Sequence, residues 1–267
     1  MTSPKIVANN LIKRFGEGPG AITALDGINL AVPEGEFVCI LGPSGCGKST
    51  LLFIAAGLEK ATSGEIVVDG RVVTHPGRER GMLFQQFALF PWRTARKNIE
   101  FGLEVQNIDT ATRWNKCKHW LSIMNLEEFA DMYPHQLSGG MQQRIAIARL
   151  LINDPEILLM DEPFAALDAQ TRTLLGEELV RVWQATRRTV LFVTHSVDEA
   201  IYLADRLLVM TKRPGRFKAD LRITLPRPRD PAADEFNAIR REVTRLVRSE
   251  VAIAEEGARS VETGAHS

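Results

Sequence analysis

Short runs of apolar residues recur along the chain, and most stop abruptly at a glycine or a polar residue. Four of them are continuous and rich in branched or aromatic side chains, which is typical of strands that are buried on both faces of a sheet. They are Glu36–Leu41, Ile157–Met160, Thr189–Thr194 and Leu207–Thr211. Because helical stretches separate them, the pattern predicts an α/β fold with a mostly parallel sheet between helices.

Further strands are expected in the N-terminal third of the chain. Ile6–Leu11 and Ala21–Leu30 flank the turn-rich segment Gly16–Gly20, as in two strands joined by a loop. Glu65–Asp69 and Arg71–Thr74 are separated by Gly70, which predicts a hairpin. One more short strand is expected at Met82–Gln85.

Helical spacing of apolar residues marks the remaining segments. One helix is expected from Gly47 to the glycine stop at Gly57, and another over Asp198–Asp205. From about Ala95 to Arg149 the pattern is helical throughout. An apolar stripe on one helix is expected from Trp120, Ile123, Met124 and Phe129.

The C-terminal part has a different composition. Pro214–Pro231 is rich in proline and arginine, so we expect the core to end there. The arginine-rich stretch Arg213–Arg229 could meet anionic lipid, but its prolines favour a solvated linker. A last amphipathic helix is predicted from the helical spacing of Phe236, Ile239, Val243, Leu246 and Val247. The small, polar tail beyond about Glu255 is expected to be frayed.

Composition narrows the class of protein. The chain has 267 residues, 45% of them hydrophobic, and its 33 basic and 33 acidic side chains cancel. This balance argues against a dominant nucleic-acid surface. Three widely spaced cysteines indicate free thiols in a reducing compartment. No apolar run approaches the roughly 18 residues of a membrane span, and the first residues lack the apolar core of a signal peptide.

The segment from Gly42 to Ser49 matches the phosphate-loop pattern G-x-x-x-x-G-K-[ST]. Glycines let the backbone N–H groups converge on a phosphate chain, and the helix that follows directs its positive end at the same anion. Lys48 is expected to reach the β and γ phosphates and Ser49 to bind Mg²⁺. The competing interpretation is a plain glycine-rich turn before a helix, but a strand before and a helix after favour the phosphate loop.

Two acids and a histidine follow other predicted strands. Asp161 and Glu162 come directly after Ile157–Met160, so Asp161 is expected to hold Mg²⁺ and Glu162 to polarise the attacking water. Either acid could instead only cap a turn. His195 follows Thr189–Thr194. A lone histidine there would be a helix-capping or satisfied surface residue, but the two other strand ends assigned to ATP favour its contact with the γ-phosphate or the water.

A second candidate phosphate site begins at Ser138. Ser138-Gly139-Gly140 opens a predicted helix from Gln142 to Leu151, and the N-terminus of a helix offers bare backbone donors. A simple N-cap is the alternative. One nucleotide does not need two phosphate cradles from one chain.

These motifs make the chain resemble the ATP-binding subunit of an ABC transporter. Leu137–Met141 (LSGGM) resembles the signature L-S-G-G-Q, with Met141 in place of glutamine, and Ala166-Leu167-Asp168 resembles the D-loop. Gln85 resembles the Q-loop glutamine and Phe15 the aromatic A-loop residue. The resemblance covers about Lys5 to Pro226. Three further stretches resemble the nitrate, sulfonate and taurine importer branch: Gly57-Leu58-Glu59, Phe90-Pro91-Trp92 and Leu208–Gly215.

The resemblance implies a P-loop NTPase with a RecA-like sheet, an N-terminal antiparallel β subdomain and an inserted helical subdomain at about 88–153. The ATPase domain would span 1–230, and the C-terminal helix and tail 231–267. Two subunits would form a head-to-tail dimer, in which the Ser138 loop of one copy closes over the ATP held by the Lys48 loop of the other.

The resemblance also assigns roles residue by residue. Phe15 would stack on adenine, Glu162, His195 and Lys48 would serve catalysis, and Asp168 would link the two sites. Magnesium would be served by Ser49, Gln85 and Asp161. The residues expected to bind the phosphates are Gly42, Pro43, Ser44, Gly45, Cys46, Gly47, Lys48, Ser49 and Thr50, with Ser138, Gly139 and Gly140 from the second copy.

The expected function is that of an importer ATPase on the cytoplasmic face of the membrane. Its partners would be transmembrane permease subunits and, indirectly, an extracytoplasmic solute-binding protein. Nucleic acid is not expected as a partner. A short permease helix is expected in a groove around Phe87, Phe90 and Trp92, although each of these side chains could instead be core. The solute could be nitrate, taurine or a sulfonate. A soluble ABC ATPase and a P-loop kinase are the alternatives.

Overall fold

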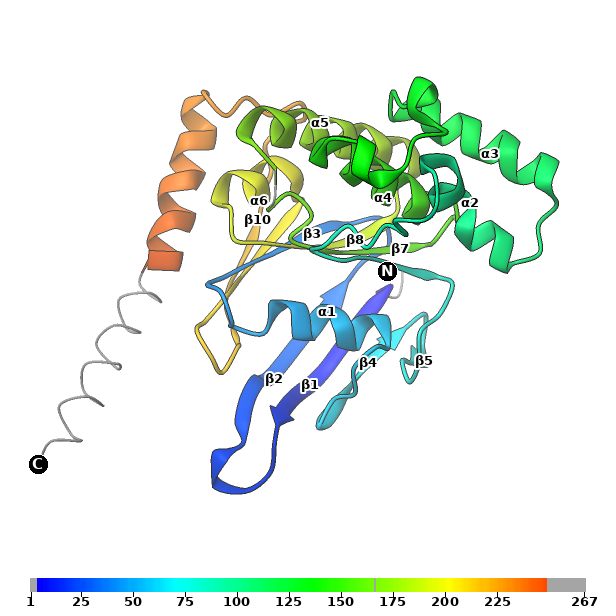
Figure 1. Cartoon of the computed structure of the whole chain (residues 1–267). Helices are drawn as coiled ribbons and strands as arrows, with labels where there is room; N and C mark the ends of the chain where they lie inside the picture. The colour runs from blue at the N-terminus through cyan, green and yellow to red at the C-terminus, as the bar shows by residue number, and fades with distance from the viewer. Residues whose placement is uncertain (1–3, 166, 249–267) are drawn as a thin grey trace, which may run out of the picture. The chain divides into compact units, whose positions relative to one another are not determined.

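The computed structural model describes residues 4–165 and 167–248. They form two compact units. The first unit comprises the described residues up to Pro76 and from Thr189, and the second comprises those of Gly77–Arg188. In Figure 1 the second unit is the part coloured from turquoise to yellow-green.

An antiparallel sheet occupies the N-terminal part of the first unit, with strand order β2-β1-β4-β5. Its strands are β1 (Ile6–Phe15), β2 (Ile22–Val32), β4 (Ser63–Val68) and β5 (Arg71–Val72), and the short 3-10 helix η1 (Gly18–Gly20) joins β1 to β2. Ile6 in β1 lies opposite Val32 on one side and opposite Val68 on the other. The predicted strands and hairpin are therefore present, and β1 runs on to Phe15.

A second group of strands in the first unit surrounds β3 (Phe37–Leu41). It is parallel to β8 (Thr189–Thr194) on one side and to β9 (Arg206–Met210) on the other. Every residue of β3 and β8 is buried, as the continuous apolar runs predict. The helix α1 (Lys48–Ala56) follows β3, and α6 (Val197–Leu203) follows β8.

The prediction of a solvated linker over Arg213–Arg229 is wrong. Residues Phe217–Arg222 form β10, which pairs antiparallel with β9. Arg229 is only 5% exposed and donates to carbonyl oxygens at the end of α6; burial lowers its pKa to about 10. The available signal was the alternation of apolar and polar residues over Phe217–Arg222, which is typical of a half-buried strand.

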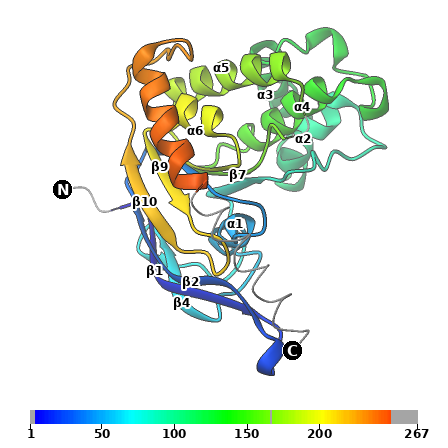
Figure 2. The ribbon, with the colours of Figure 1, turned by 90° about the vertical axis from the view of Figure 1, so that its left-hand side faces the viewer.

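A helix covers residues 234–248 at the C-terminal end of the described chain. Phe236 and Val243 are buried on one of its faces, as expected for an amphipathic helix. Arg240 pairs with Asp198 of α6, with 2.5 Å between Nε and Oδ1, and Figure 2 shows the helix in orange beside α6. The expected frayed tail lies outside the described residues.

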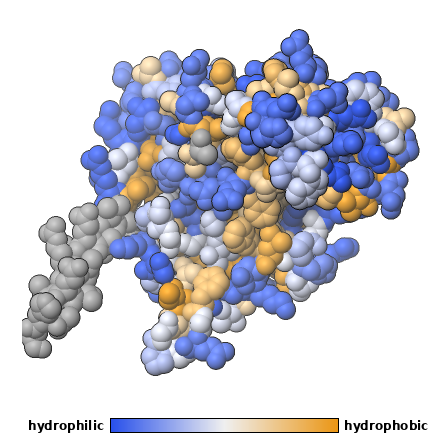
Figure 3. Space-filling view, viewed as in Figure 1, coloured by the Kyte–Doolittle hydropathy of each residue, from blue (hydrophilic) through white to orange (hydrophobic). Residues whose placement is uncertain are grey.

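The second unit combines two parallel strands with helices. The strands are β6 (Arg80–Leu83) and β7 (Ile157–Asp161). The helices are α2 (Ala95–Val105), α3 (Thr110–Ile123), η2 (Glu127–Phe129), η3 (Pro134–Gln136), α4 (Gly139–Leu151) and α5 (Ala169–Thr186). The side chains of Thr94, Asp109, Ser138 and Asp168 each cap one α-helix by accepting a backbone N–H bond. Hydrophilic residues dominate the helices on the face drawn in Figure 3.

The predicted apolar stripe is only partly correct. Trp120 and Ile123 lie on α3 but are half-buried, and Phe129 belongs to η2. The helix ends before Asn125, whose φ is 51°, so the 3.6-residue period does not extend to Phe129. In the described part of the chain, no helix is both long enough and apolar enough to cross a membrane.

Candidate functional site

In the first unit, two parallel strands end side by side. Leu41 at the end of β3 is paired with Thr194 at the end of β8. Gly42, the residue after β3, begins the phosphate loop. His195, the residue after β8, is exposed. The structure therefore brings the phosphate loop and His195 to the same edge, as expected from the sequence.

The phosphate loop closes around a buried lysine. Lys48 is 3% exposed, and its Nζ donates to the carbonyl oxygens of Gly42 at 2.9 Å and Pro43 at 3.0 Å. The N-cap of α1 is Gly47, with a φ of 103° and no side chain to cap the helix. A Cβ at Gly47 would lie 2.7 Å from the Ala24 carbonyl oxygen. A buried cation and an uncapped helix N-terminus fit a bound phosphate chain.

The turn between β9 and β10 supports the phosphate loop. This support was not predicted from the sequence. Gly215 donates its N–H to the Ala24 carbonyl at 2.9 Å, and its own carbonyl accepts from Asp26 at 3.1 Å. A Cβ at Gly215 would lie 2.1 Å from the Cys46 carbonyl oxygen, so a side chain there would displace the loop. The Pro-Gly pair at 214–215 was the available signal.

In the second unit, β6 and β7 also end side by side. Leu83 of β6 is paired with Met160 of β7, so Gln85 and the Asp161-Glu162 pair follow at one edge. Asp161 is 5% exposed. β6 begins and ends two residues earlier than predicted, and Gln85 therefore lies beyond the strand and is exposed.

Glu162 has an uncommon backbone conformation. Its φ is 44°, in the left-handed region that costs a non-glycine residue of the order of 1 kcal/mol or more. Its carbonyl accepts a hydrogen bond from Ala165 at 3.1 Å, which closes a tight turn after the strand. Strain of this kind persists where the surrounding structure holds a side chain in a particular direction.

Ser138 and Asp168 occupy two further helix N-termini of the second unit. Ser138 caps α4, where its Oγ accepts from the Met141 N–H at 3.3 Å, and both Ser138 and Gly139 are exposed. Asp168 caps α5 and is exposed, while Ala166 of the same motif lies outside the described residues. Phe15, in the first unit, ends β1 with 42% of its surface exposed.

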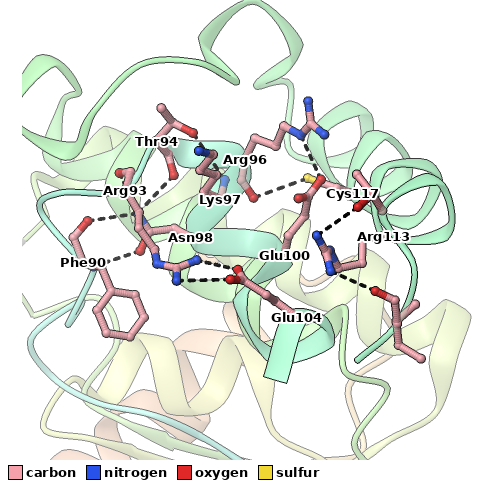
Figure 4. A network of polar contacts seen from close by, with 12 residues as sticks. Phe90, Arg93, Thr94, Arg96, Lys97, Asn98, Glu100, Glu104, Arg113 and Cys117 are labelled. Atoms are coloured by element: carbon pink, nitrogen blue, oxygen red, sulfur yellow. Dashed lines mark hydrogen bonds and ion pairs between the residues drawn. The ribbon is translucent and has the colours of Figure 1, made fainter. Parts of the chain in front are cut away.

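The loop before α2 is fixed by one buried amide. Asn98 is fully buried; its Oδ1 accepts from the Phe90 N–H at 2.8 Å, and its Nδ2 donates to the Arg93 carbonyl at 2.9 Å (Figure 4). Arg149 of α4 donates to the Phe87 carbonyl at 2.8 Å. Trp92 is nevertheless 71% exposed, so its interpretation as a core residue is wrong.

A groove of about 930 Å³ lies within the second unit, beside this loop. Phe90, Phe101 and Val105 contribute apolar surface to it, and Arg149 and Asn153 contribute polar atoms. Of the three aromatic residues expected around the groove, only Phe90 lines it. Trp92 lies next to Phe90, with 5.7 Å between the ring centroids.

Comparisons with known proteins identify the family. Residues 25–165 match the ABC transporter family. An uncharacterized ABC transporter ATP-binding protein of Methanocaldococcus jannaschii is 53% identical over 92% of each chain. The nitrate import ATP-binding protein NrtD of a Synechocystis species is 47% identical over 84% of each. The aliphatic sulfonates import ATP-binding protein SsuB of Bacillus cereus is 44% identical over 88% of this chain and 92% of that one.

A solved structure supports the same assignment. The dimeric post-hydrolysis state of an ATP-binding cassette with ADP and phosphate superposes with a TM-score of 0.74 and 35% identity, over 83% of this chain and all of that one. The chain belongs to the ABC transporter family. It is an ATP-binding subunit with ATPase activity, and its resemblance to the nitrate and sulfonate importer branch is confirmed.

Proposed function

We propose that this chain energises an importer for a small anionic solute of the nitrate, sulfonate or taurine type. The observation that carries the proposal is its similarity, over most of its length, to ATP-binding subunits named for nitrate and sulfonate import. In that role it binds to the cytoplasmic face of the membrane as a peripheral subunit, and a separate permease crosses the bilayer. Specificity for the solute lies in the permease and in an extracytoplasmic binding protein.

The first unit supplies the nucleotide's main contacts in this proposal. Phe15, exposed at the end of β1, stacks on adenine, and the backbone N–H groups from Gly42 to Thr50 bind the phosphates. Lys48 would exchange its carbonyl partners for phosphate oxygens, which form stronger, charge-assisted hydrogen bonds. His195 follows the strand next to the loop and contacts the γ-phosphate.

The second unit supplies the acids of the reaction. Gln85 and Asp161 of this unit, with Ser49 of the phosphate loop, are the side chains that would hold Mg²⁺, which would supply charge neutralisation on the phosphates. Glu162 orients and polarises the attacking water. Its strained backbone sets the direction of that carboxylate.

The site is completed by a second copy in a head-to-tail dimer. Ser138, Gly139 and Gly140 present the exposed N-terminus of α4 to the γ-phosphate on the partner, and Asp168 links the two sites. The dimeric state of the related cassette supports this arrangement. The permease contacts the groove lined by Phe90 and Phe101, with the exposed Trp92 as an anchor at its side.

The decisive test of the catalytic assignment is Glu162→Gln. The amide keeps the size and hydrogen-bonding atoms of the carboxylate but loses the charge that polarises water. We expect ATP affinity within about threefold of the wild type and turnover reduced at least about a hundredfold, in the range of lost general-base catalysis. Loss of ATP binding together with turnover would exclude this role for Glu162.

The solute is tested with the whole importer. The subunit is co-purified with its permease, reconstituted in vesicles, and assayed for ATPase stimulation by the cognate binding protein with nitrate, taurine or an alkanesulfonate. Stimulation by one of these anions supports the proposal. Failure to bind any permease favours a soluble ABC ATPase.

A further inference from the structure

Two helix N-termini of the second unit meet at one threonine side chain. A Cβ built on Gly140 would lie 2.6 Å from the methyl carbon Cγ2 of Thr171, far inside van der Waals contact. The methyl group therefore fills the space that any side chain at position 140 would need. Gly140 lies in the first turn of α4 and Thr171 in the first turn of α5, and the two helices run side by side in Figure 1.

The other half of the Thr171 side chain holds Asp168. Its hydroxyl donates to Asp168 Oδ2 at 2.7 Å, while its backbone N–H donates to Oδ1 at 2.9 Å. An N-cap requires only the backbone bond. The second bond fixes the rotation of the carboxylate, and the two bonds together lower the pKa of Asp168, the backbone bond more strongly.

The hydroxyl and the methyl group of Thr171 are held at a fixed angle because both branch from Cβ, where rotation is restricted. A rotation of Asp168 that drags the hydroxyl would therefore drive the methyl group against Gly140 or away from it. The close contact transmits such a displacement because the methyl group already lies against Gly140.

We propose that Thr171 is a positioning residue that ties the Ser138–Gly140 loop to Asp168, so that both reach the partner copy's nucleotide as one rigid body. The proposal rests on the head-to-tail dimer of the proposed function. It goes beyond it because neither loop's own contact with nucleotide requires them to be joined. Thr171 acts through its neighbours and does not itself touch ATP.

Two nearly isosteric variants separate the halves of the side chain. Thr171→Val keeps a methyl group at Cγ2 and loses the hydroxyl, whereas Thr171→Ser keeps the hydroxyl and loses the methyl group. The matched control is Thr173→Val on the exposed face of α5, where the hydroxyl bonds only locally to the Ala169 carbonyl at 3.1 Å. All are made in the full chain carrying Glu162→Gln, and ATP-dependent dimerisation is measured by analytical ultracentrifugation, beside ATP affinity at low protein concentration.

We expect both Thr171 variants to weaken dimerisation about five- to tenfold, the effect of one hydrogen bond or one packed methyl group, with ATP affinity of the single subunit changed by less than about twofold. Thr173→Val changes neither quantity. Wild-type dimerisation in either Thr171 variant overturns the coupling. So does an equal loss in Thr173→Val, because that result assigns Thr171 only a general role in helix stability.

The packing half has its own test. Gly140→Ala should lower the midpoint of thermal unfolding, and adding Thr171→Ser should restore much of it by removing the methyl group that the new Cβ meets. Additive losses overturn the packing contact. If the Glu162→Gln parent fails to dimerise with ATP, the proposed head-to-tail dimer is wrong, and the coupling with it. If the parent dimerises and every Thr171 variant dimerises as well as the parent, only the coupling is wrong.

Discussion

The N-terminus of α1 and the N-terminus of α4 are both glycine-bearing, yet they are built in opposite ways. At α1 the cap residue is Gly47, and the loop turns inward around Lys48, which is 3% exposed. At α4 the cap is the Ser138 side chain, and Ser138 and Gly139 face solvent. A Cβ at Gly47 would collide with Ala24, whereas one at Gly139 would meet no atom within 4 Å.

This difference indicates which loop can hold an anion alone. The α1 loop folds around the buried Lys48 and precedes a helix N-terminus with no side-chain cap, so it offers both a cation and backbone donors to an anion. The α4 loop offers a hydroxyl and backbone donors on an open surface, without a cation in its Ser-Gly-Gly turn. A loop of that kind contributes to a ligand that another surface already holds, which is the role expected of it in a dimer.

The largest effect is expected from removing the cation of the phosphate loop. Lys48→Ala removes the only lysine of the Gly42–Thr50 loop, so ATP affinity should fall about tenfold to a hundredfold or more, since charge-assisted hydrogen bonds contribute about 1.5–3 kcal/mol each. Equilibrium binding of a fluorescent ATP analogue measures this. The exposed Lys97→Ala on α2 is the control and should bind normally. Unchanged affinity in Lys48→Ala would contradict the cradle.

The sequence predicts the phosphate loop at the N-terminus of α1 well because its signals are local. The continuous apolar runs of β3 and β8 and the spacing of Gly42, Gly47 and Lys48 lie within short segments, and their order alone places the loop and His195 at one edge. What the sequence could not predict depends on distant partners. The support of the loop by Gly215 joins segments nearly 170 residues apart, and the sequence does not show that β10 pairs with β9.

The surroundings of the α4 N-terminus are predicted less completely, because they also depend on residues distant in the sequence. Ser138 and Asp168 could be identified as caps from residue type, but their connection through Thr171 arises from the packing of α4 against α5. The left-handed φ of Glu162 has no signature in residue type, because only glycine and asparagine adopt that region readily. Exposure of Trp92 could not be decided either, since an aromatic residue in a loop suits a core and a docking surface equally.

A substitution at Gly139 should block the Ser138–Gly140 loop without affecting the phosphate loop. Because Gly139 has open space around it, Gly139→Asp should fold normally and bind ATP with wild-type affinity as a single subunit. The carboxylate would repel the partner's γ-phosphate, so ATPase activity should fall at least about tenfold. Measuring nucleotide affinity, steady-state ATPase activity and thermal unfolding separates these effects.

Mixed dimers test which copy completes each site. Combining Lys48→Ala subunits with Gly139→Asp subunits produces dimers in which one site carries both lesions and the other carries none. ATPase activity above that of either variant alone is expected. Activity no higher than in the separate variants would show that each chain works with its own α4 loop, and the contrast between the two helix N-termini would then have another explanation.

The smallest expected effect concerns stability, and it tests whether the surface of the second unit is as open as its exposed loops indicate. Trp92→Ala should change the free energy of unfolding by less than about 0.5 kcal/mol, because the side chain is 71% exposed. The matched variant is Trp183→Ala in α5, where the indole is 2% exposed and donates to the Arg188 carbonyl; it should lose about 3–5 kcal/mol. Basal ATPase activity should survive in Trp92→Ala, while co-purification with the permease and transport decrease. Chemical denaturation of both variants decides the matter: a loss in Trp92→Ala comparable to that in Trp183→Ala would make Trp92 structural, and the anchor for the permease would have to be sought elsewhere along the groove.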